Sequence, residues 1–136
     1  MLKQNLAFVD IETTGLDRDR HEIIELGAVI VEQEWGADGK PVFRHVGEID
    51  LKIRPEHIEN ADPQALRVNG YDPADWIFAV PLLDAMKLFA EKTQGAIFVA
   101  HNVTFDYGFI EKAFSVTEVE NKMHYHKLDT ISVAFA

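Results

Sequence analysis

An apolar run near the start of the chain ends in two acidic residues and then a turn. Leu6-Ala7-Phe8-Val9 is typical of a buried strand, and Asp10-Ile11-Glu12 follows it before the breaker Thr13-Thr14-Gly15. Because side chains two positions apart in a strand share a face, Asp10 and Glu12 are expected to project together. Two like charges in a partly dry site repel each other unless a cation or a proton compensates. The pattern indicates a metal site or, as the simpler alternative, a frayed strand end with two solvated acids.

The strand-like segments that follow predict a sheet. Residues 23–31 are rich in β-branched side chains, and residues 42–53 alternate loosely after a turn-like Gly36-Ala37-Asp38-Gly39. Together with the first strand they predict a three-stranded antiparallel meander with short connections. Residues 54–76 are polar and punctuated by Pro and Gly, so we expect a loop with one short helix at 63–68.

The second half of the chain alternates between helix and strand. A helix is expected to begin near Pro81, with apolar residues at helical spacing: Leu82, Ala85, Met86 and Phe89. Residues 96–100 predict the next strand, and Asn102 is placed to cap a second helix over 103–114. Residues 127–136 begin a further strand or helix. A meander followed by alternating helices and strands predicts an α/β fold with a ribonuclease-H-like mixed sheet.

A third acid interrupts the apolar face of the helix expected over 103–114. On a helical wheel Asp106 lies in the middle of the apolar stripe, which consists of Phe109, Ile110, Ala113 and Phe114. The opposite side carries Gly108, Glu111 and Lys112. An aspartate that accepts bonds from first-turn amides is the plain alternative, but it is less expected one turn into the helix. Asp10, Glu12 and Asp106 therefore predict three inward carboxylates, and oxygen-only ligands of this kind suit Mg²⁺ or Mn²⁺.

Two longer segments resemble a known family. Phe8-Val9-Asp10-Ile11-Glu12-Thr13-Thr14-Gly15-Leu16 strongly resembles the first motif of the DEDD 3′–5′ exonucleases, and His101-Asn102-Val103-Thr104-Phe105-Asp106-Tyr107-Gly108-Phe109-Ile110 resembles the second. The family includes the proofreading exonuclease subunit of bacterial replicative polymerases and ribonuclease T. Residues 24–29 resemble its second strand, and residues 127–130 resemble its continuation after the second motif. The similarity covers nearly the whole chain.

The resemblance implies roles for individual residues. It makes three carboxylates the catalytic residues and metal ligands: Asp10, Glu12 and Asp106. It assigns substrate binding to Thr13, Thr14, Leu16 and Phe105. The implied cofactors are two Mg²⁺ or Mn²⁺ ions, which can activate water and stabilise the leaving oxygen when about 4 Å apart. The implied substrates are the 3′ ends of single-stranded DNA or RNA, and a DNA polymerase subunit is the implied protein partner.

The third motif of the family is not found at its usual place. That motif supplies a fourth carboxylate and a His or Tyr that orients or deprotonates the attacking water, several dozen residues beyond the second motif. Only 30 residues follow Asp106, and the pairs His124–Asp129 and Tyr125–Asp129, which mimic its spacing, come too soon. We therefore expect residues 1–136 to be a single exonuclease domain that lacks its C-terminal helices and is weak or inactive alone. The face left exposed would favour a homodimer.

Composition and charge narrow the classes of function that this chain could have. The 136 residues include no cysteine, which excludes disulfide and thiolate chemistry. The formal net charge of −10 argues against a broad basic nucleic-acid face, but not against contact with phosphate through bound cations. No apolar run approaches the roughly 18 residues of a membrane-spanning helix, and no signal peptide is evident, so we expect a cytoplasmic protein without membrane contact. Two alternatives remain: a non-catalytic module that binds nucleic-acid ends or a polymerase, and a metal-binding phosphatase.

Overall fold

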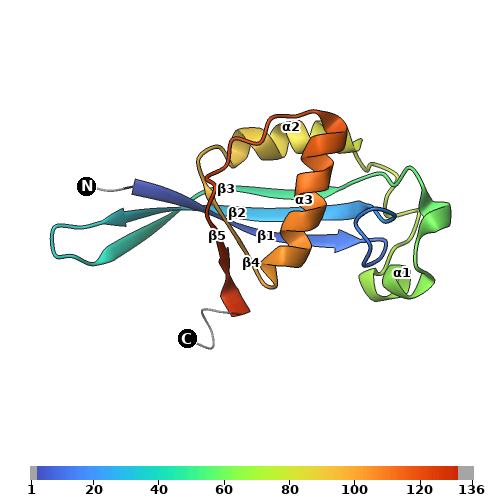
Figure 1. The fold of residues 1–136 in the computed structure, drawn as a ribbon, viewed down its shortest axis with the longest axis horizontal. Helices are drawn as coiled ribbons and strands as arrows, with labels where there is room; N and C mark the ends of the chain where they lie inside the picture. The colour runs from blue at the N-terminus through green and yellow to red at the C-terminus, as the bar shows by residue number, and fades with distance from the viewer. Residues whose placement is uncertain (1–2, 132–136) are drawn as a thin grey trace.

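The computed structural model describes residues 3–131, which form one mixed sheet of five strands (Figure 1). In chain order the strands are β1 (Lys3–Thr13), β2 (Ile23–Trp35), β3 (Pro41–Lys52), β4 (Ile97–Ala100) and β5 (Lys127–Asp129). Across the sheet their order is β3-β2-β1-β4-β5, with β1 antiparallel to β2, β2 antiparallel to β3, and β4 parallel to both β1 and β5. The antiparallel meander and the mixed sheet predicted from the sequence are confirmed.

The helical segments found between residues 3 and 131 are the 3₁₀ turn η1 (Ile58–Asn60), α1 (Pro63–Asn69), α2 (Leu82–Lys92) and α3 (Val103–Thr117). Each helix expected from the sequence is therefore present. In this described part of the chain, no helix is both long and apolar enough to cross a membrane. The element expected at 127–136 is β5 as far as Asp129, and residues 132–136 lie outside the described residues.

The alternation of side chains along β1 decides which residues enter the core. Ala7, Val9 and Ile11 are buried in one cluster with side chains of α2 and α3, which lie across the same face of the sheet (Figure 1). The alternate residues of β1 point to the other face, where Phe8 is 43% exposed and Val29 of β2 is 40% exposed. We call this second side of the sheet the open face.

The directions in which the β1 side chains point differ from one prediction made from the sequence, that Asp10 and Glu12 point inward. Asp10 and Glu12 share a face as predicted, but that face is the open one: Asp10 is exposed and Glu12 is partly exposed. Only Asp106 is buried. All three carboxylates were predicted to point inward. For Asp10 and Glu12 this prediction is wrong, because the alternate residues Val9 and Ile11 occupy the core face of β1.

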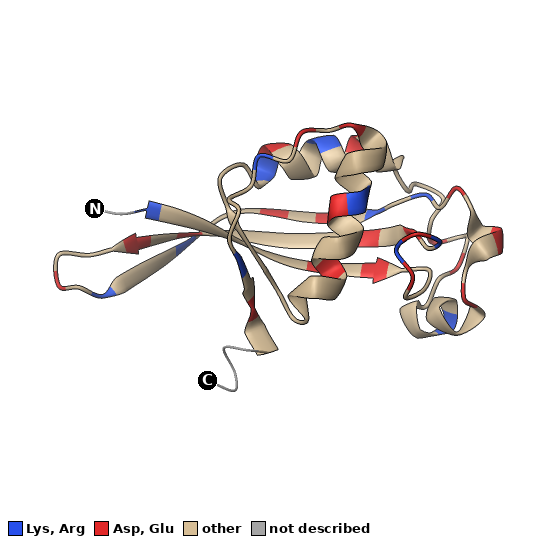
Figure 2. Cartoon of the chain, in the orientation of Figure 1, with Lys and Arg blue, Asp and Glu red and all other residues tan. Residues whose placement is uncertain are grey.

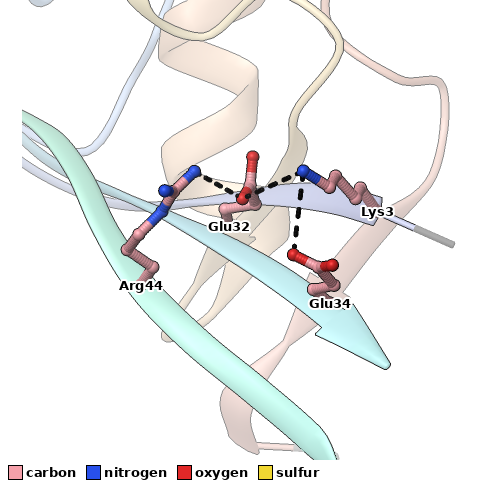
Figure 3. Close-up of polar contacts among 4 residues, drawn as sticks. All are labelled: Lys3, Glu32, Glu34 and Arg44. Carbon is pink, nitrogen blue, oxygen red and sulfur yellow. Dashed lines mark hydrogen bonds and ion pairs between the residues drawn. The ribbon is translucent and has the colours of Figure 1, made fainter. Parts of the chain in front are cut away.

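At the end of the sheet away from Asp10 and Glu12, the β2–β3 hairpin extends beyond the helices (Figure 1). Four charged residues pair there in what we call the hairpin ladder, shown in Figure 3: Lys3, Glu32, Glu34 and Arg44. Arg44 lies 2.7 Å from the Glu32 carboxylate, and Lys3 lies 4.0 Å from Glu32 and 3.7 Å from Glu34. Each acid of this ladder therefore has a cationic neighbour.

Candidate active site

The C-terminal end of β1 places three acids on neighbouring strands. Asp10 lies opposite Gly27, and Glu12 lies opposite Glu25 of β2, where a register irregularity follows. Partial burial raises the pKa of Glu12 above its ordinary value, and the negative charges of Asp10 and Glu25 raise it further. Figure 2 shows acidic positions gathered at this end of β1 and β2. The strand ends therefore concentrate negative charge on the open face.

The first turn of α3 adds a buried carboxylate to this end of the sheet. Asp106 is 6% exposed. The pKa of Asp106 is raised to about 6, mainly by burial and further by the negative charge of Asp10. The amides of Ile11 and of Asp106 itself act in the opposite direction and lower this pKa. The charge of Glu12 also contributes to the rise. The fold thus brings the acid of the second motif into electrostatic range of both acids of the first.

We call Asp10, Glu12 and Asp106 the carboxylate cluster. Among residues 3–131, none of its members forms an ion pair. All its donors are carboxylate oxygens, the ligand type that Mg²⁺ and Mn²⁺ prefer, so the residues present fit a hard divalent cation. In the same described residues, no group of three or more His, Cys, Asp or Glu side chains is arranged so that it could hold a metal ion. Metal binding by the cluster therefore remains a prediction.

Glu25 and Lys52 are neighbours of the cluster that sequence patterns did not connect. Their strands pair in register, and the Lys52 ammonium lies 3.3 Å from the Glu25 carboxylate and 4.7 Å from the centre of the Trp76 ring. The charge of Glu25 is therefore neutralised by a neighbouring lysine. Only the register of β2 with β3 could have revealed Lys52.

The start of α3 is held by a residue distant in sequence. Asn102 occupies the cap position with a left-handed backbone (φ 64°), but its side chain makes no capping bond, so its predicted capping role is wrong. Instead, the Asp129 carboxylate accepts hydrogen bonds from the amides of Asn102 (3.2 Å), Val103 (3.3 Å) and Ile131 (2.9 Å). Burial acts to raise the pKa of Asp129, but these amides outweigh it and lower that pKa. The parallel pairing of Ala100 with Asp129 makes this capping possible.

The hydrogen bonds of Asp129 also help to judge the two residue pairs, His124–Asp129 and Tyr125–Asp129, whose spacing mimics the third motif. Asp129 uses both carboxylate oxygens on backbone amides, so it has a clear structural role. Tyr125 is 76% exposed, and its ring stacks on His124 with 4.6 Å between ring centres. None of the three residues is among the causes of the pKa shifts of Glu12 and Asp106. These observations agree with rejecting both mimics.

The predicted substrate-binding residues differ in what they expose. Thr13 and Thr14 are buried, and each hydroxyl is used within the chain: Thr13 Oγ1 donates to the Gly15 carbonyl (2.6 Å), and Thr14 Oγ1 accepts from the Glu22 amide (2.9 Å). Phe105 is partly buried, with its ring 5.1 Å from that of Phe109. Leu16 is 82% exposed. Of these four side chains, only that of Leu16 is fully available for contact.

Gly108 of the second motif also departs from the helical-wheel prediction. The wheel placed it on the solvent side, but it is buried. The Arg18 side chain covers it, and a Cβ added at Gly108 would lie 3.0 Å from Arg18 Nη1. The loop that follows β1 therefore packs on α3 two residues along the chain from Asp106.

The chain matches a family model described as Exonuclease (RNase_T) over residues 7–136. The match includes both motifs and the carboxylate cluster. The chain belongs to this exonuclease family. The resemblance to DEDD 3′–5′ exonucleases inferred from the motifs is thereby confirmed.

Curated proteins similar to this exonuclease domain are longer than this chain, to different extents. Ribonuclease T of Haemophilus influenzae is 31% identical, over 94% of this chain and 59% of that protein. The 3′-5′ exonuclease DinG of Staphylococcus epidermidis is 31% identical, over 85% of this chain and 12% of that protein. A PolC-type DNA polymerase III of Lacticaseibacillus paracasei is 31% identical, over 90% of this chain and 9% of that protein. The exonuclease domain spans little more than half the length of the ribonuclease T proteins, 52% and 59% in two of them.

Solved structures similar to the exonuclease domain share its fold. Exonuclease I from Methylocaldum szegediense superposes with a TM-score of 0.73 at 16% identity, over 96% of this chain and 28% of that one. Exonuclease I from E. coli in complex with a dT13 oligonucleotide gives a TM-score of 0.71 at 12% identity, over 96% of this chain and 29% of that one. These likenesses confirm the predicted ribonuclease-H-like α/β fold.

Proposed function

We propose that this exonuclease domain hydrolyses phosphodiester bonds at the 3′ end of single-stranded DNA or RNA. Asp10, Glu12 and Asp106 would hold two divalent cations, Mg²⁺ or Mn²⁺. One observation carries the proposal: a buried acid in α3 lies within electrostatic range of two acids at the end of β1, and none of the three has a cationic partner within residues 3–131. Such an arrangement is costly for folding, so its presence favours a role that needs the charge.

In the proposed reaction, different residues would bind the cations, fix the helix that carries Asp106 and contact the terminal base. Bound cations would supply Lewis-acid stabilisation of the developing charge and an activated water. The cluster contributes ligands from two elements, and the Asp129 cap fixes the start of the helix that carries Asp106. Leu16 offers an apolar surface for the terminal base. Residues 3–131 contain no assigned general base, so we expect weak hydrolysis by these 136 residues alone.

A digestion assay tests the proposal directly. Single-stranded DNA and RNA labelled at the 5′ end are incubated with the protein and Mg²⁺ or Mn²⁺, and then with a chelator. The proposal expects products that shorten from the 3′ end, disappear with chelator and disappear in Asp10→Ala. A matched control, Glu34→Ala, removes an acid at the opposite end of the sheet and is expected to cut normally. Absence of both cleavage and Asp10-dependent Mn²⁺ binding would overturn the proposal.

A non-catalytic module is the second candidate. The lack of an assigned general base within residues 3–131 supports it, because such a domain could bind Mn²⁺ and a 3′ end without cleaving it. Mn²⁺ binding that depends on Asp10, together with no cleavage, would favour this candidate over the first.

Protein partners and location are also proposals. The PolC-type relative contains a polymerase, which supports a polymerase subunit as partner, and one similar structure is described as an exonuclease I/SSB-Ct complex. The exposed Phe8 and Val29 on the open face support a homodimer. We propose a cytoplasmic location, in keeping with nuclease relatives such as ribonuclease T.

A further inference from the structure

The loop over residues 14–22, which we call the site loop, closes on itself directly after β1. The Thr14 amide donates to the Glu22 carbonyl (2.9 Å), and the Glu22 amide donates to Thr14 Oγ1 (2.9 Å). The Glu22 carboxylate then accepts from the amides of Glu56 (2.9 Å) and His57 (3.0 Å). The two ends of the site loop are thus joined to each other and to the segment that precedes η1.

His21 joins the two sides of the site loop internally. Its Nδ1 accepts a hydrogen bond from the Asp17 amide (3.0 Å), while its own amide donates to the Asp17 carbonyl (2.7 Å). Its ring lies directly against Gly15, where an added Cβ would clash with the imidazole. The backbone of Gly15 is not in the left-handed region, so the imidazole ring requires glycine here and the chain conformation does not.

Beyond these bonds, the site loop is held by Arg18, whose side chain packs on Gly108 of α3. Residues 19–22 border an open pocket of about 440 Å³, whose lining also includes Ile53, Phe109 and Lys112. Lys112 donates a hydrogen bond from Nζ to the Arg18 carbonyl. Because a loop that borders an open pocket can shift more easily than one packed on a core, these hydrogen bonds and the Arg18 contact determine its position.

The conformation held in this way displays Leu16. That side chain is 82% exposed and lies between Gly15 and Asp17, the two residues that His21 contacts. A free loop would be expected to turn an exposed leucine toward neighbouring apolar side chains and away from water. We propose that His21 is a positioning residue, which holds the turn so that Leu16 stands beside the carboxylate end of β1 and contacts the terminal nucleotide. The inference rests on the proposed function, since it assumes that a nucleic-acid 3′ end binds there.

A double-mutant cycle tests whether His21 acts through Leu16. His21→Phe retains a ring against Gly15 but loses the acceptor for the Asp17 amide, and Leu16→Ala removes the displayed side chain. Initial rates with a single-stranded oligonucleotide are expected to show KM raised about tenfold in each single variant, with kcat within about twofold of the wild type. The double variant is expected to resemble Leu16→Ala. Additive effects, or an unchanged KM in folded His21→Phe, would overturn the proposal.

Two further variants separate positioning from simple loss of stability. His21→Asn keeps a carbonyl acceptor near the place of Nδ1 and is expected to restore much of the KM. His45→Phe makes the same replacement at an exposed position of β3 and is expected to leave KM and kcat unchanged. Equal losses in His21→Phe and His21→Asn with unchanged loop dynamics would count against a role for the Asp17 bond.

Hydrogen exchange gives a measurement that does not depend on cleavage. The Asp17 amide is expected to exchange at least about tenfold faster in His21→Phe than in the wild type, because its acceptor is lost. Unchanged exchange would overturn the role of His21 whatever the enzyme does. If the wild type does not cleave, the proposed function fails and the same cycle is measured as oligonucleotide Kd. Absence of a His21 effect on that Kd would then refute the positioning role as well.

Discussion

The two ends of the sheet hold their acids in opposite ways. In the hairpin ladder each carboxylate has a lysine or arginine within 4.0 Å, and the four side chains lie on the surface of the hairpin (Figure 3). In the carboxylate cluster, no member forms an ion pair among residues 3–131, and one member, Asp106, is buried in α3. Both groups lie in the same fold, so proximity to a strand end does not explain the difference.

The difference separates charge that assists folding from charge that opposes it. Paired surface acids contribute little but cause no penalty. Acids that are crowded and desolvated raise each other's pKa, as Glu12 and Asp106 show, and therefore destabilise the metal-free protein near neutral pH. A divalent cation would reverse this effect at the cluster and have no such effect at the ladder. Each prediction below compares matched changes at the two ends.

The largest expected difference is in catalysis. Asp10→Ala should lower metal-dependent cleavage of single-stranded oligonucleotides by about 10³-fold or more, because a ligand of the proposed cations is lost. Glu34→Ala should leave the rate within about twofold. Initial rates in Mn²⁺ with 5′-labelled substrate measure both. Similar losses in the two variants would show that general acidity, and not the cluster, supports activity.

An acid-to-amide change should have opposite effects on stability at the two ends. Asp106→Asn is expected to stabilise the metal-free protein by about 1–3 kcal/mol at pH 7.5, because the buried charge is removed. The pKa of Asp106 is about 6 in the fold and 3.8 ordinarily, so the gain should shrink as the pH falls below 6 and vanish below about 4. Urea unfolding in chelator measures this effect.

The matched change at the ladder is Glu32→Gln, which removes the bonds to Arg44 and Lys3. It should destabilise the protein by less than about 1 kcal/mol. Adding Mn²⁺ should stabilise the wild type more than Asp106→Asn and should not distinguish wild type from Glu32→Gln. A loss of stability in metal-free Asp106→Asn at pH 7.5 would contradict this account.

Local patterns in the sequence predicted the elements and the acids that meet. The period of two in β1 correctly placed Asp10 and Glu12 on one face, and the helical spacing from Leu82 to Phe89 predicted the buried side of α2. The pattern could not decide which face of β1 is covered, since Phe8 is as apolar as Val9. That choice depends on helices packed from the second half of the chain.

Contacts between distant segments account for the remaining errors. Asn102 stands at the cap position of α3, but Asp129 supplies the capping oxygens because β5 pairs with β4. Gly108 is on the outer side of the helical wheel, but Arg18 covers it. His21 follows no recognisable local pattern, and its role emerges only when the site loop is closed. These contacts join residues that are distant in sequence, and a single sequence gives no sign of which distant residues will meet.

A smaller effect is expected from the lysine next to the cluster. Lys52→Gln leaves Glu25 unpaired and makes the open face more negative, so Mn²⁺ should bind about three- to fivefold more tightly at low salt. Lys3→Gln, the same change in the hairpin ladder, should leave the Mn²⁺ affinity unchanged. Isothermal titration of both variants tests this. Weaker Mn²⁺ binding by Lys52→Gln would mean that Lys52 orients Glu25 and does more than reduce its charge.

The smallest effect should come from the ladder itself. Arg44→Gln removes the 2.7 Å contact with Glu32 at a position where the arginine side chain is 67% exposed, so the expected loss of stability is about 0.5 kcal/mol. Because exposed pairs are screened, the loss measured by urea unfolding should disappear in about 1 M NaCl. The cluster should respond to salt in the other direction: screening lessens its internal repulsion and stabilises the metal-free protein. A salt-independent loss in Arg44→Gln would mean that the arginine stem packs on the hairpin, and the ladder would then stabilise the hairpin by contact and not by charge.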